Sequence, residues 1–235
     1  MRINQYLARC GVASRRGADK LIESGAVYID GRVAVPGDQV DSKSNVIVSG
    51  KPVRLPDEYI VMAYYKPVGV TCTEKDQHAD RIITDEIKCD RRLTYAGRLD
   101  KDSEGLILMT DDGILINAMM RGSAMHEKEY EVSVDTKLTD KQIIQLREGI
   151  YIEELDVTTR PCKVRRTGDN TFNIILTQGL NRQIRRMCSK IGCNVMSIKR
   201  TRVMNIRLGD LQVGASRNLT EEEKTTLYLE CGLHI

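Results

Sequence analysis

The stretch 93–109, LTYAGRLDKDSEGLILM, sets two short apolar segments on either side of a charged loop. Residues 93–96 and 106–109 have the length and composition of buried β-strands. The loop between them is too short for the helical crossover that joins parallel strands. This spacing favours an antiparallel arrangement, and it recurs between other neighbouring strand candidates of the chain.

Four further segments are predicted strands, and three stretches between them are predicted helices. The strands are expected at residues 59–65, 130–134, 172–176 and 195–198. One helix is expected after a cap formed by Asp112, another after Thr139, and a basic third one from Asn181 to Gly192. The sequence therefore predicts an α+β fold with a mixed, largely antiparallel sheet.

Residues 1–50 carry the pattern of a smaller unit with two helices and a hairpin. Gly11 ends a first short helix, and Ser14 is placed to cap a second one that ends at Gly25. Asp30-Gly31 then suits the positive backbone angles of a tight hairpin turn. Two prolines in residues 51–58 predict a linker, because proline blocks both a helix and a central strand. We expect an αα-β domain at 1–50, a linker at 51–58 and a larger domain at 59–235.

The composition limits the classes of protein that fit. The chain has 235 residues, 4% aromatic residues and seven cysteines, without a CxxC pair. An odd number of scattered cysteines argues against a disulfide framework and against a zinc site, so reduced thiols and no metal are expected. The N-terminus lacks the apolar core of a signal peptide, and no apolar run has the length to cross a bilayer. We therefore expect a cytoplasmic protein without membrane contact.

Positive charge is concentrated in one part of the chain. The net charge is only +3, but residues 170–209 contain no Asp or Glu and eight Arg or Lys. A segment with one sign of charge implies an anionic partner, most simply phosphate. The alternative is a basic face that contacts only solvent.

The loop of the opening stretch has five charged residues among the seven at 98–104. On composition alone, it is either a solvated turn or a site in which a carboxylate such as Asp100 does chemistry. A buried, charge-paired carboxylate needs a neighbouring cation. The later segment 183–186, QIRR, supplies arginines for that purpose.

Residues 14–22, SRRGADKLI, and 25–31, GAVYIDG, resemble the RNA-binding domain first described in the fourth small-subunit ribosomal protein. The resemblance covers most of residues 1–50 and implies that this domain contacts RNA. The alternative is a charged helical hairpin that acts only as a folding cap. The basic residues expected to reach the phosphate backbone are Arg9, Arg15, Arg16, Lys20 and Arg32.

The opening stretch and the basic segment together resemble the RsuA-type ribosomal pseudouridine synthases. GRLDKDSEGL at 97–106 and GLNRQIRRM at 179–187 match two signature motifs of that family. KPVGV at 66–70 and KEY at 128–130 match two more, while LGDL at 208–211 and RNLT at 217–220 match the closing segment. The motifs keep the family's order and span nearly the whole chain. The resemblance implies isomerisation of uridine to pseudouridine in structured RNA, by base flipping.

The resemblance also assigns roles position by position. It makes Asp100 the catalytic aspartate, which either attacks ribose C1′ or removes the C2′ proton, and both routes stay open. Arg185 is expected to pair with Asp100. Tyr130 is expected to stack on or beside the uracil and to help remove the C5 proton, although by alternation alone it reads as a core tyrosine. No metal or organic cofactor is required, and RNA contacts are expected from Arg98, Arg182 and Arg186.

Within that family, QGLN at 178–181 and RTRVMN at 200–205 look most like the RluF subgroup, which acts on large-subunit ribosomal RNA and in some cases on transfer RNA. Gln178 and Ala215-Ser216 depart from the common pattern, outside the catalytic set. We expect a monomer with ribosomal RNA, and in addition tRNA, as partner. Two alternatives stay open: a non-catalytic RNA-binding factor of the ribosome, and a glycosidase-like hydrolase with Glu104 as its second carboxylate.

Overall fold

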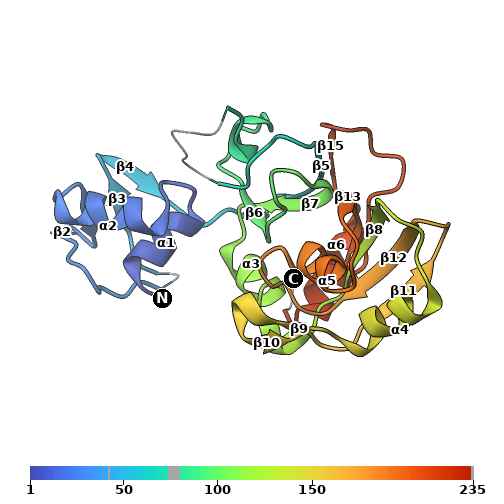
Figure 1. The fold of residues 1–235 in the computed structure, drawn as a ribbon. Coiled ribbons are helices and arrows are strands. Elements are labelled where there is room, and N and C mark those ends of the chain that lie inside the picture. Colours follow the sequence, from blue (N-terminus) through green and yellow to red (C-terminus); the bar gives the residue numbers. More distant parts are fainter. Residues whose placement is uncertain (42, 74–79, 234–235) are drawn as a thin grey trace. The chain divides into compact units, whose positions relative to one another are not determined.

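The computed structural model describes residues 1–41, 43–73 and 80–233 and divides the chain into two compact units. The first unit comprises Met1–Ile60 with the segments Cys89–Leu93 and Thr110–Gly113, and the second comprises the rest. In Figure 1 the α-helices of the first unit are blue, and those of the second run from green to red. Each unit has its own cluster of buried apolar side chains.

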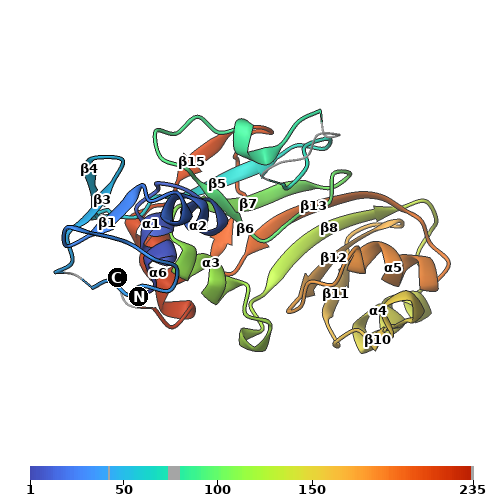
Figure 2. The ribbon, with the colours of Figure 1, turned by 90° about the vertical axis from the view of Figure 1, so that its left-hand side faces the viewer.

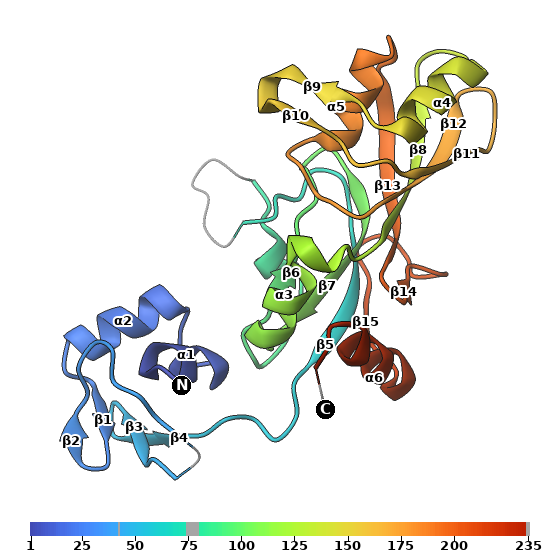
Figure 3. The same ribbon diagram turned by 90° about the horizontal axis from the view of Figure 1, so that it is seen from below.

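Two helices and a four-stranded antiparallel sheet form the first unit (Figure 3). The Ser14 hydroxyl accepts a hydrogen bond from the Gly17 backbone N–H, which confirms the predicted helix cap. Asp30 and Gly31 have φ values of 51° and 86°, as the tight hairpin turn requires. The elements are α1 (Ile3–Arg9), α2 (Arg15–Glu23), β1 (Val27–Ile29), β2 (Arg32–Val33), β3 (Val46–Val48) and β4 (Lys51–Val53), with strand order β2-β1-β3-β4.

The strand β4 differs from the sequence expectation. Pro52 and Pro56 predict a linker at residues 51–58, yet residues 51–53 pair with β3 at the edge of the sheet. An edge strand tolerates proline because one side of its backbone has no neighbour to bond. The core beneath the sheet is formed by apolar side chains from both helices, from β1 and β3, and from the connection between β2 and β3, including Leu7, Ile22, Val27 and Val46.

A nine-stranded mixed sheet organises the second unit. β11 with β12, β12 with β8, β8 with β13 and β5 with β15 pair antiparallel, whereas β13 with β7 is parallel. These pairings confirm the predicted α+β class with a mixed sheet. The main order is β11-β12-β8-β13-β7-β5-β15, with β14 beside β13 and β6 beside β7. The strands are β5 (Val61–Lys66), β6 (Thr94–Ala96), β7 (Glu104–Thr110), β8 (Lys128–Val134), β11 (Lys163–Arg166), β12 (Thr171–Leu176), β13 (Val195–Val203), β14 (Ile206–Arg207) and β15 (Ser216–Asn218).

Helices cover the sheet, and Figure 2 shows α4 and α5 along β8, β11 and β12. Thr139 caps α4 through a capping box, as predicted. α5 begins later than expected, because its cap is Arg182 in a left-handed conformation and not Asn181. The unit also contains α3 (Gly113–Met119), α4 (Asp140–Glu148), α5 (Gln183–Lys190), α6 (Glu221–Glu230), the small sheet β9 (Tyr151–Ile152) with β10 (Val157–Thr158), and 3-10 turns at Ile83–Asp85, Gly122–Ala124 and Glu153–Leu155.

The C-terminal helix α6 was not predicted, although the sequence holds its signal. Thr220 accepts from the backbone N–H of Glu223, and the Glu223 side chain accepts from the Thr220 backbone N–H. A Thr followed by Glu three residues later is a capping-box signature. Its residues Leu227 and Tyr228 join the core of the sheet. None of the helices in the described segments is long and apolar enough to span a membrane.

Candidate active site

A cavity of about 370 Å³ lies in the second unit, at the charged loop 97–104. Its wall combines that loop with the end of β12, the start of α5 and the faces of β8 and β13. Among the predicted site residues it includes Arg98, Asp100, Tyr130 and Arg182. The remaining lining residues are Thr71, Cys72, Leu99, Lys101, Ser103, Leu176, Gln178, Gly179, Leu180, Asn181, Gln183, Ile184 and Ile198.

Asp100 projects from a tight turn between β6 and β7. Its backbone carbonyl accepts a hydrogen bond from the Ser103 N–H at 3.1 Å, which closes the turn. The preceding Gly97 has a φ of 81°, a conformation that few side chains tolerate. The Asp100 side chain is 35% exposed, so its carboxylate can be reached from the cavity. The loop is therefore an ordered site and not a solvated turn.

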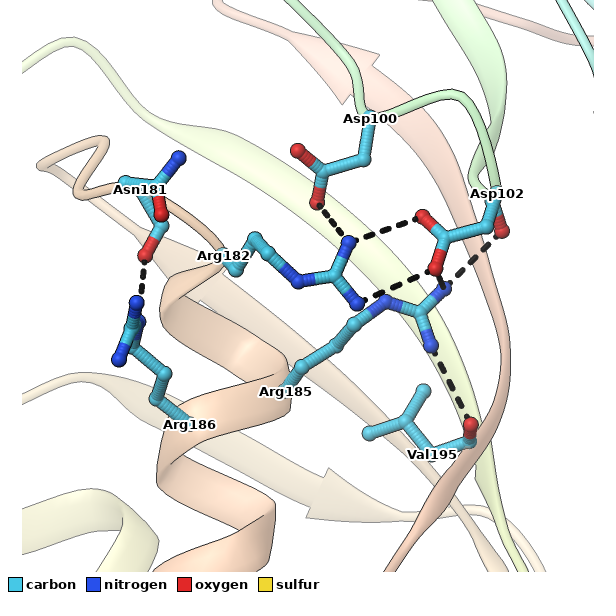
Figure 4. A network of polar contacts seen from close by, with 7 residues as sticks. All are labelled: Asp100, Asp102, Asn181, Arg182, Arg185, Arg186 and Val195. Atoms are coloured by element: carbon cyan, nitrogen blue, oxygen red, sulfur yellow. Dashed lines mark hydrogen bonds and ion pairs between the residues drawn. The ribbon is translucent and has the colours of Figure 1, made fainter.

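Figure 4 shows which arginine faces Asp100. Nη1 of Arg182 lies 3.9 Å from Oδ2 of Asp100, and both Nη atoms of Arg182 also bind the Asp102 carboxylate. Arg185 instead places Nη2 3.2 Å from Oδ2 of Asp102 and 3.0 Å from its carbonyl oxygen. The expected ion pair between Arg185 and Asp100 is therefore wrong: the loop turns Asp102, not Asp100, toward Arg185.

Asp102 is thus a site residue that the sequence reasoning did not assign. It holds two guanidinium groups, and it thereby fixes Arg182 beside Asp100. Nη1 of Arg185 also donates to the carbonyl oxygen of Val195, which ties the start of β13 to α5. The sequence signal for this role is a second carboxylate two residues after Asp100 in the same loop. The structure adds that this carboxylate lies close to the start of the basic helix α5.

Tyr130 forms part of the opposite wall, in the middle of β8. It is 8% exposed and pairs across the sheet with Arg200 on β13 and with Ile174 on β12. The apolar side chains of Leu176 and Ile198 line the cavity on either side of it. The cavity therefore has charged groups on one wall and an aromatic ring among apolar groups on another.

The segment after β5 braces the Asp100 loop. Lys66 is fully buried, and its ammonium donates to the carbonyl oxygens of Pro67 and Val70. Burial lowers the pKa of Lys66, while Cys72 and the loop carboxylates act in the opposite direction. The Gly69 N–H donates to the Lys101 carbonyl at 2.7 Å, so this turn fixes the loop that carries Asp100. KPVGV is therefore a supporting element.

The predicted RNA-binding arginines of the second unit differ in what they contact. The side chain of Arg98 is exposed at the cavity. Arg186 points elsewhere, since it binds Glu154 at 3.2 Å and the carbonyl of Asn181 at 3.1 Å. Lys190 on the same helix binds Glu153 at 3.0 Å. The far part of α5 is thus already paired with acidic side chains.

The five cations of the first unit divide in a similar way. Arg9 donates to the Tyr59 hydroxyl and lies over its ring, and Arg32 forms a two-point ion pair with Asp38. This pairing lowers the pKa of Asp38. By contrast, the side chains on α2 are exposed and have no ion pair with a residue of the described segments: Arg15, Arg16 and Lys20.

No group of three or more His, Cys, Asp or Glu side chains within the described ranges is arranged to hold a metal ion. All seven cysteines are unpaired thiols. Burial raises the pKa of Cys188 to about 12, which makes this thiol a poor nucleophile.

Comparison with known proteins finds a matching family model for each of the two units. Residues 60–190 match the family model described as RNA pseudouridylate synthase, and residues 1–55 match the S4 domain. The chain is 42% identical to the dual-specificity RNA pseudouridine synthase RluF of Salmonella typhi, over 97% of this chain and 78% of that protein. It is 35% identical to the ribosomal large subunit pseudouridine synthase B of Vibrio cholerae, over 88% and 67%.

Two further relatives extend this comparison. An uncharacterized RNA pseudouridine synthase of Aquifex aeolicus is 36% identical over 95% of this chain and 94% of that protein. The crystal structure of a pseudouridylate synthase superposes with a TM-score of 0.71 and 25% identity, covering 97% of this chain and 99% of the other. The similarity thus includes the order of both units.

Proposed function

The chain belongs to the RNA pseudouridylate synthase family, and from this membership we propose that Asp100 isomerises a flipped uridine of large-subunit ribosomal RNA in the cavity described above. Conversion of uridine to pseudouridine in RNA is the activity named for its relatives. The observation that carries the proposal is the Asp100 carboxylate, which lines the cavity beside Arg182 and faces a wall that holds Tyr130.

The reaction requires a group that acts on the ribose. The bond from C1′ to N1 breaks, the uracil turns, and a bond from C1′ to C5 forms. The proton on C5 leaves, and N1 takes up a proton, so that the product is an isomer of uridine. In one route the Asp100 carboxylate attacks C1′ and is displaced when C5 returns. In the other route it takes the C2′ proton and gives it back. Both routes need the carboxylate at the sugar, and both leave the atoms of uridine unchanged in number.

Arg182 is proposed to position Asp100. Its two hydrogen bonds to Asp102 fix the guanidinium, and its Nη1 then limits the rotamers of the Asp100 carboxylate. Tyr130 is proposed to stack on or beside the uracil and to help remove the C5 proton. Arg185 acts indirectly in this arrangement, because it binds Asp102, which in turn binds Arg182.

The dimensions of the cavity favour a flipped base. A volume of about 370 Å³ lies within the range of small-ligand sites, roughly 300–1,000 Å³, and is too small for a base-paired duplex. A uridine must therefore leave its stack to reach Asp100, which costs a few kcal/mol. The exposed Arg98 at the cavity is proposed to offset part of this cost by contacting the RNA.

The substrate class follows from the relatives and from the S4 domain. The names of the relatives include ribosomal large subunit and dual-specificity enzymes. We therefore propose large-subunit ribosomal RNA as the main substrate and transfer RNA as a second one. A monomer in the cytoplasm with an N-terminal RNA-binding domain and a C-terminal catalytic domain is part of the same proposal, without a metal or organic cofactor.

Release of tritium tests the proposed activity. Large-subunit ribosomal RNA labelled with tritium at uridine C5 should lose label to water when the wild-type protein is added, and transfer RNA should lose less. RNA binding without release would leave a non-catalytic binding factor. Release of uracil would instead indicate a hydrolase.

The exposed cations of α2 are expected to contribute to RNA affinity. Replacing Arg15, Arg16 and Lys20 together by Gln should weaken binding and reduce the slope of log K against log salt by about 2–3, since each phosphate contact contributes about 0.7–0.9. Filter binding over a salt series measures both quantities.

A matched triple variant separates this local effect from net charge. Lys43, Lys51 and Arg54 belong to the same unit and are also exposed, so their replacement by Gln removes the same charge. Equal losses of affinity in the two triple variants would contradict a role for α2. Wild-type affinity in the α2 variant would contradict it as well.

A further inference from the structure

Lys128 begins β8 on the face of the sheet that bounds the catalytic cavity. Side chains alternate along a strand, so Lys128 shares a face with Tyr130, two residues further on. Its partner across the ladder on β12 is Leu176, and both Leu176 and Tyr130 line the cavity. The side chain of Lys128 therefore lies beside the cavity wall.

Lys128 forms no ion pair with any residue that the structure describes. The two acidic residues next to it in the chain, Glu127 and Glu129, both bind Arg202 instead. Glu127 also binds Lys163. The nearest carboxylates along β8 are thus already engaged by other cations.

A second cation lies behind Lys128. Arg200 on β13 is directly opposite Tyr130, so it points to the same face of the sheet, and it is 1% exposed. Its Nε donates to the Leu106 carbonyl and its Nη1 to the Arg98 carbonyl, at 2.6 and 3.3 Å. Its Nη2 is buried and has no hydrogen-bond partner among the residues that the structure describes. Arg200 therefore places a positive charge beside the cavity without an ion pair to any carboxylate of the described segments.

The two cations affect each other. Burial, with the positive charge of Arg200 added to it, lowers the pKa of Lys128 to about 8. The other groups around Lys128 do not offset this. Leu176 comes from β12 and Val203 from β13, while Tyr130 follows Lys128 on the same strand and His126 precedes it, and none of these four residues is a carboxylate. Two adjacent cations without an anion are unfavourable unless a ligand supplies the negative charge.

We propose that Lys128 binds a backbone phosphate of the RNA strand that delivers the target uridine, with the buried guanidinium of Arg200 behind it as a second positive charge. An ammonium is a compact point charge suited to a phosphate oxygen. The assignment rests on the proposed function and adds to it a phosphate subsite at the edge of the cavity. Lys128 is a binding and positioning residue in this arrangement.

The subsite predicts a pH dependence of RNA binding. A bound phosphate favours the charged amine, so it raises the pKa of Lys128 above its value of about 8 in the RNA-free protein. Binding is then strongest below about pH 8, where the amine already carries its proton. Above that pH the affinity falls, by up to about tenfold per pH unit, because binding must take up a proton.

The test compares three variants with the wild type in binding to unmodified large-subunit ribosomal RNA, from about pH 7 to about pH 9. Lys128→Met should weaken binding about tenfold near pH 7 and reduce the salt slope by about 0.7–0.9. Lys128→Arg should bind like the wild type near pH 7 but lose the fall above pH 8, because arginine stays charged. Lys163→Met is the matched control, since Lys163 is an exposed cation on another strand, β11, and pairs with Glu127. This variant should follow the wild type.

The phosphate subsite would be overturned if Lys128→Met bound RNA with wild-type affinity. It would also be overturned if the RNA affinity of Lys128→Arg fell above pH 8 as much as that of the wild type. Unchanged binding with lost tritium release in Lys128→Met would also overturn it, by making Lys128 part of the chemistry. If Lys128→Met does not fold by circular dichroism, the comparison of wild type with Lys128→Arg decides alone. Tritium release by the wild type tests the proposed function separately.

Discussion

Asp100→Asn is expected to abolish the release of tritium from uridine C5 while leaving RNA binding intact. The amide has the size of the carboxylate, and the turn is closed by the backbone of Asp100 and Ser103, so the loop should keep its shape. An amide can neither attack C1′ nor accept the C2′ proton. Loss of a general base costs roughly 10²–10⁴-fold, and loss of a nucleophile roughly 10⁴–10⁶-fold.

Single-turnover tritium release and filter binding on the same RNA measure the two effects. Asp210→Asn is the control, because Asp210 is an exposed aspartate between β14 and β15. It should retain wild-type release. Substantial release by Asp100→Asn would remove Asp100 from the mechanism, and equal loss of binding and release would make it a binding residue.

Gly105→Ala is expected to destabilise the second unit by more than about 3 kcal/mol. Gly105 is in β7 and pairs in parallel with Arg200 of β13. A Cβ at this position would lie 2.5 Å from the backbone nitrogen of Arg200 and still closer to its carbonyl oxygen, and the φ of +114° disfavours any side chain. Backbone atoms cannot rotate away as a side chain can, so the two central strands would have to separate.

Urea denaturation followed by circular dichroism measures this change. The matched control is Gly113→Ala at the start of α3, where an added Cβ meets nothing within 4 Å. This second substitution should be neutral or slightly stabilising, because alanine favours helix more than glycine does. Similar midpoints for the two variants would show that the β7–β13 contact tolerates a side chain.

Local sequence signals were sufficient for most elements and for the position of the reactive loop. The apolar segments at 93–96 and 106–109 became β6 and β7, and the charged residues between them became the wall of the cavity. Ser14 and Thr139 cap helices as expected, because a cap depends only on residues three positions apart. The capping box at Thr220 depends on an equally local signal, so the start of α6 is also encoded in adjacent sequence.

Contacts between distant residues were harder to predict. Arg182 and Arg185 are three positions apart, and both carry a guanidinium group. The sequence therefore could not show which of them contacts Asp100 and which contacts Asp102. Their long side chains can span either distance, and the choice depends on how α5 lies over the loop. The family resemblance pointed to Arg185, and the geometry placed Arg182 nearest Asp100.

The sequence by itself determined the two-unit organisation, the α+β class and the loop that presents Asp100, because these depend on periodicity, caps and short spacings. Only the tertiary structure decided which charges are already paired and which are not. Arg200 donates a hydrogen bond to the Leu106 carbonyl, 94 positions away in the sequence. The two acidic neighbours of Lys128, Glu127 and Glu129, both bind Arg202 and not Lys128. Charge balance at a site depends on strand register, and register depends on side chains packing across the whole sheet.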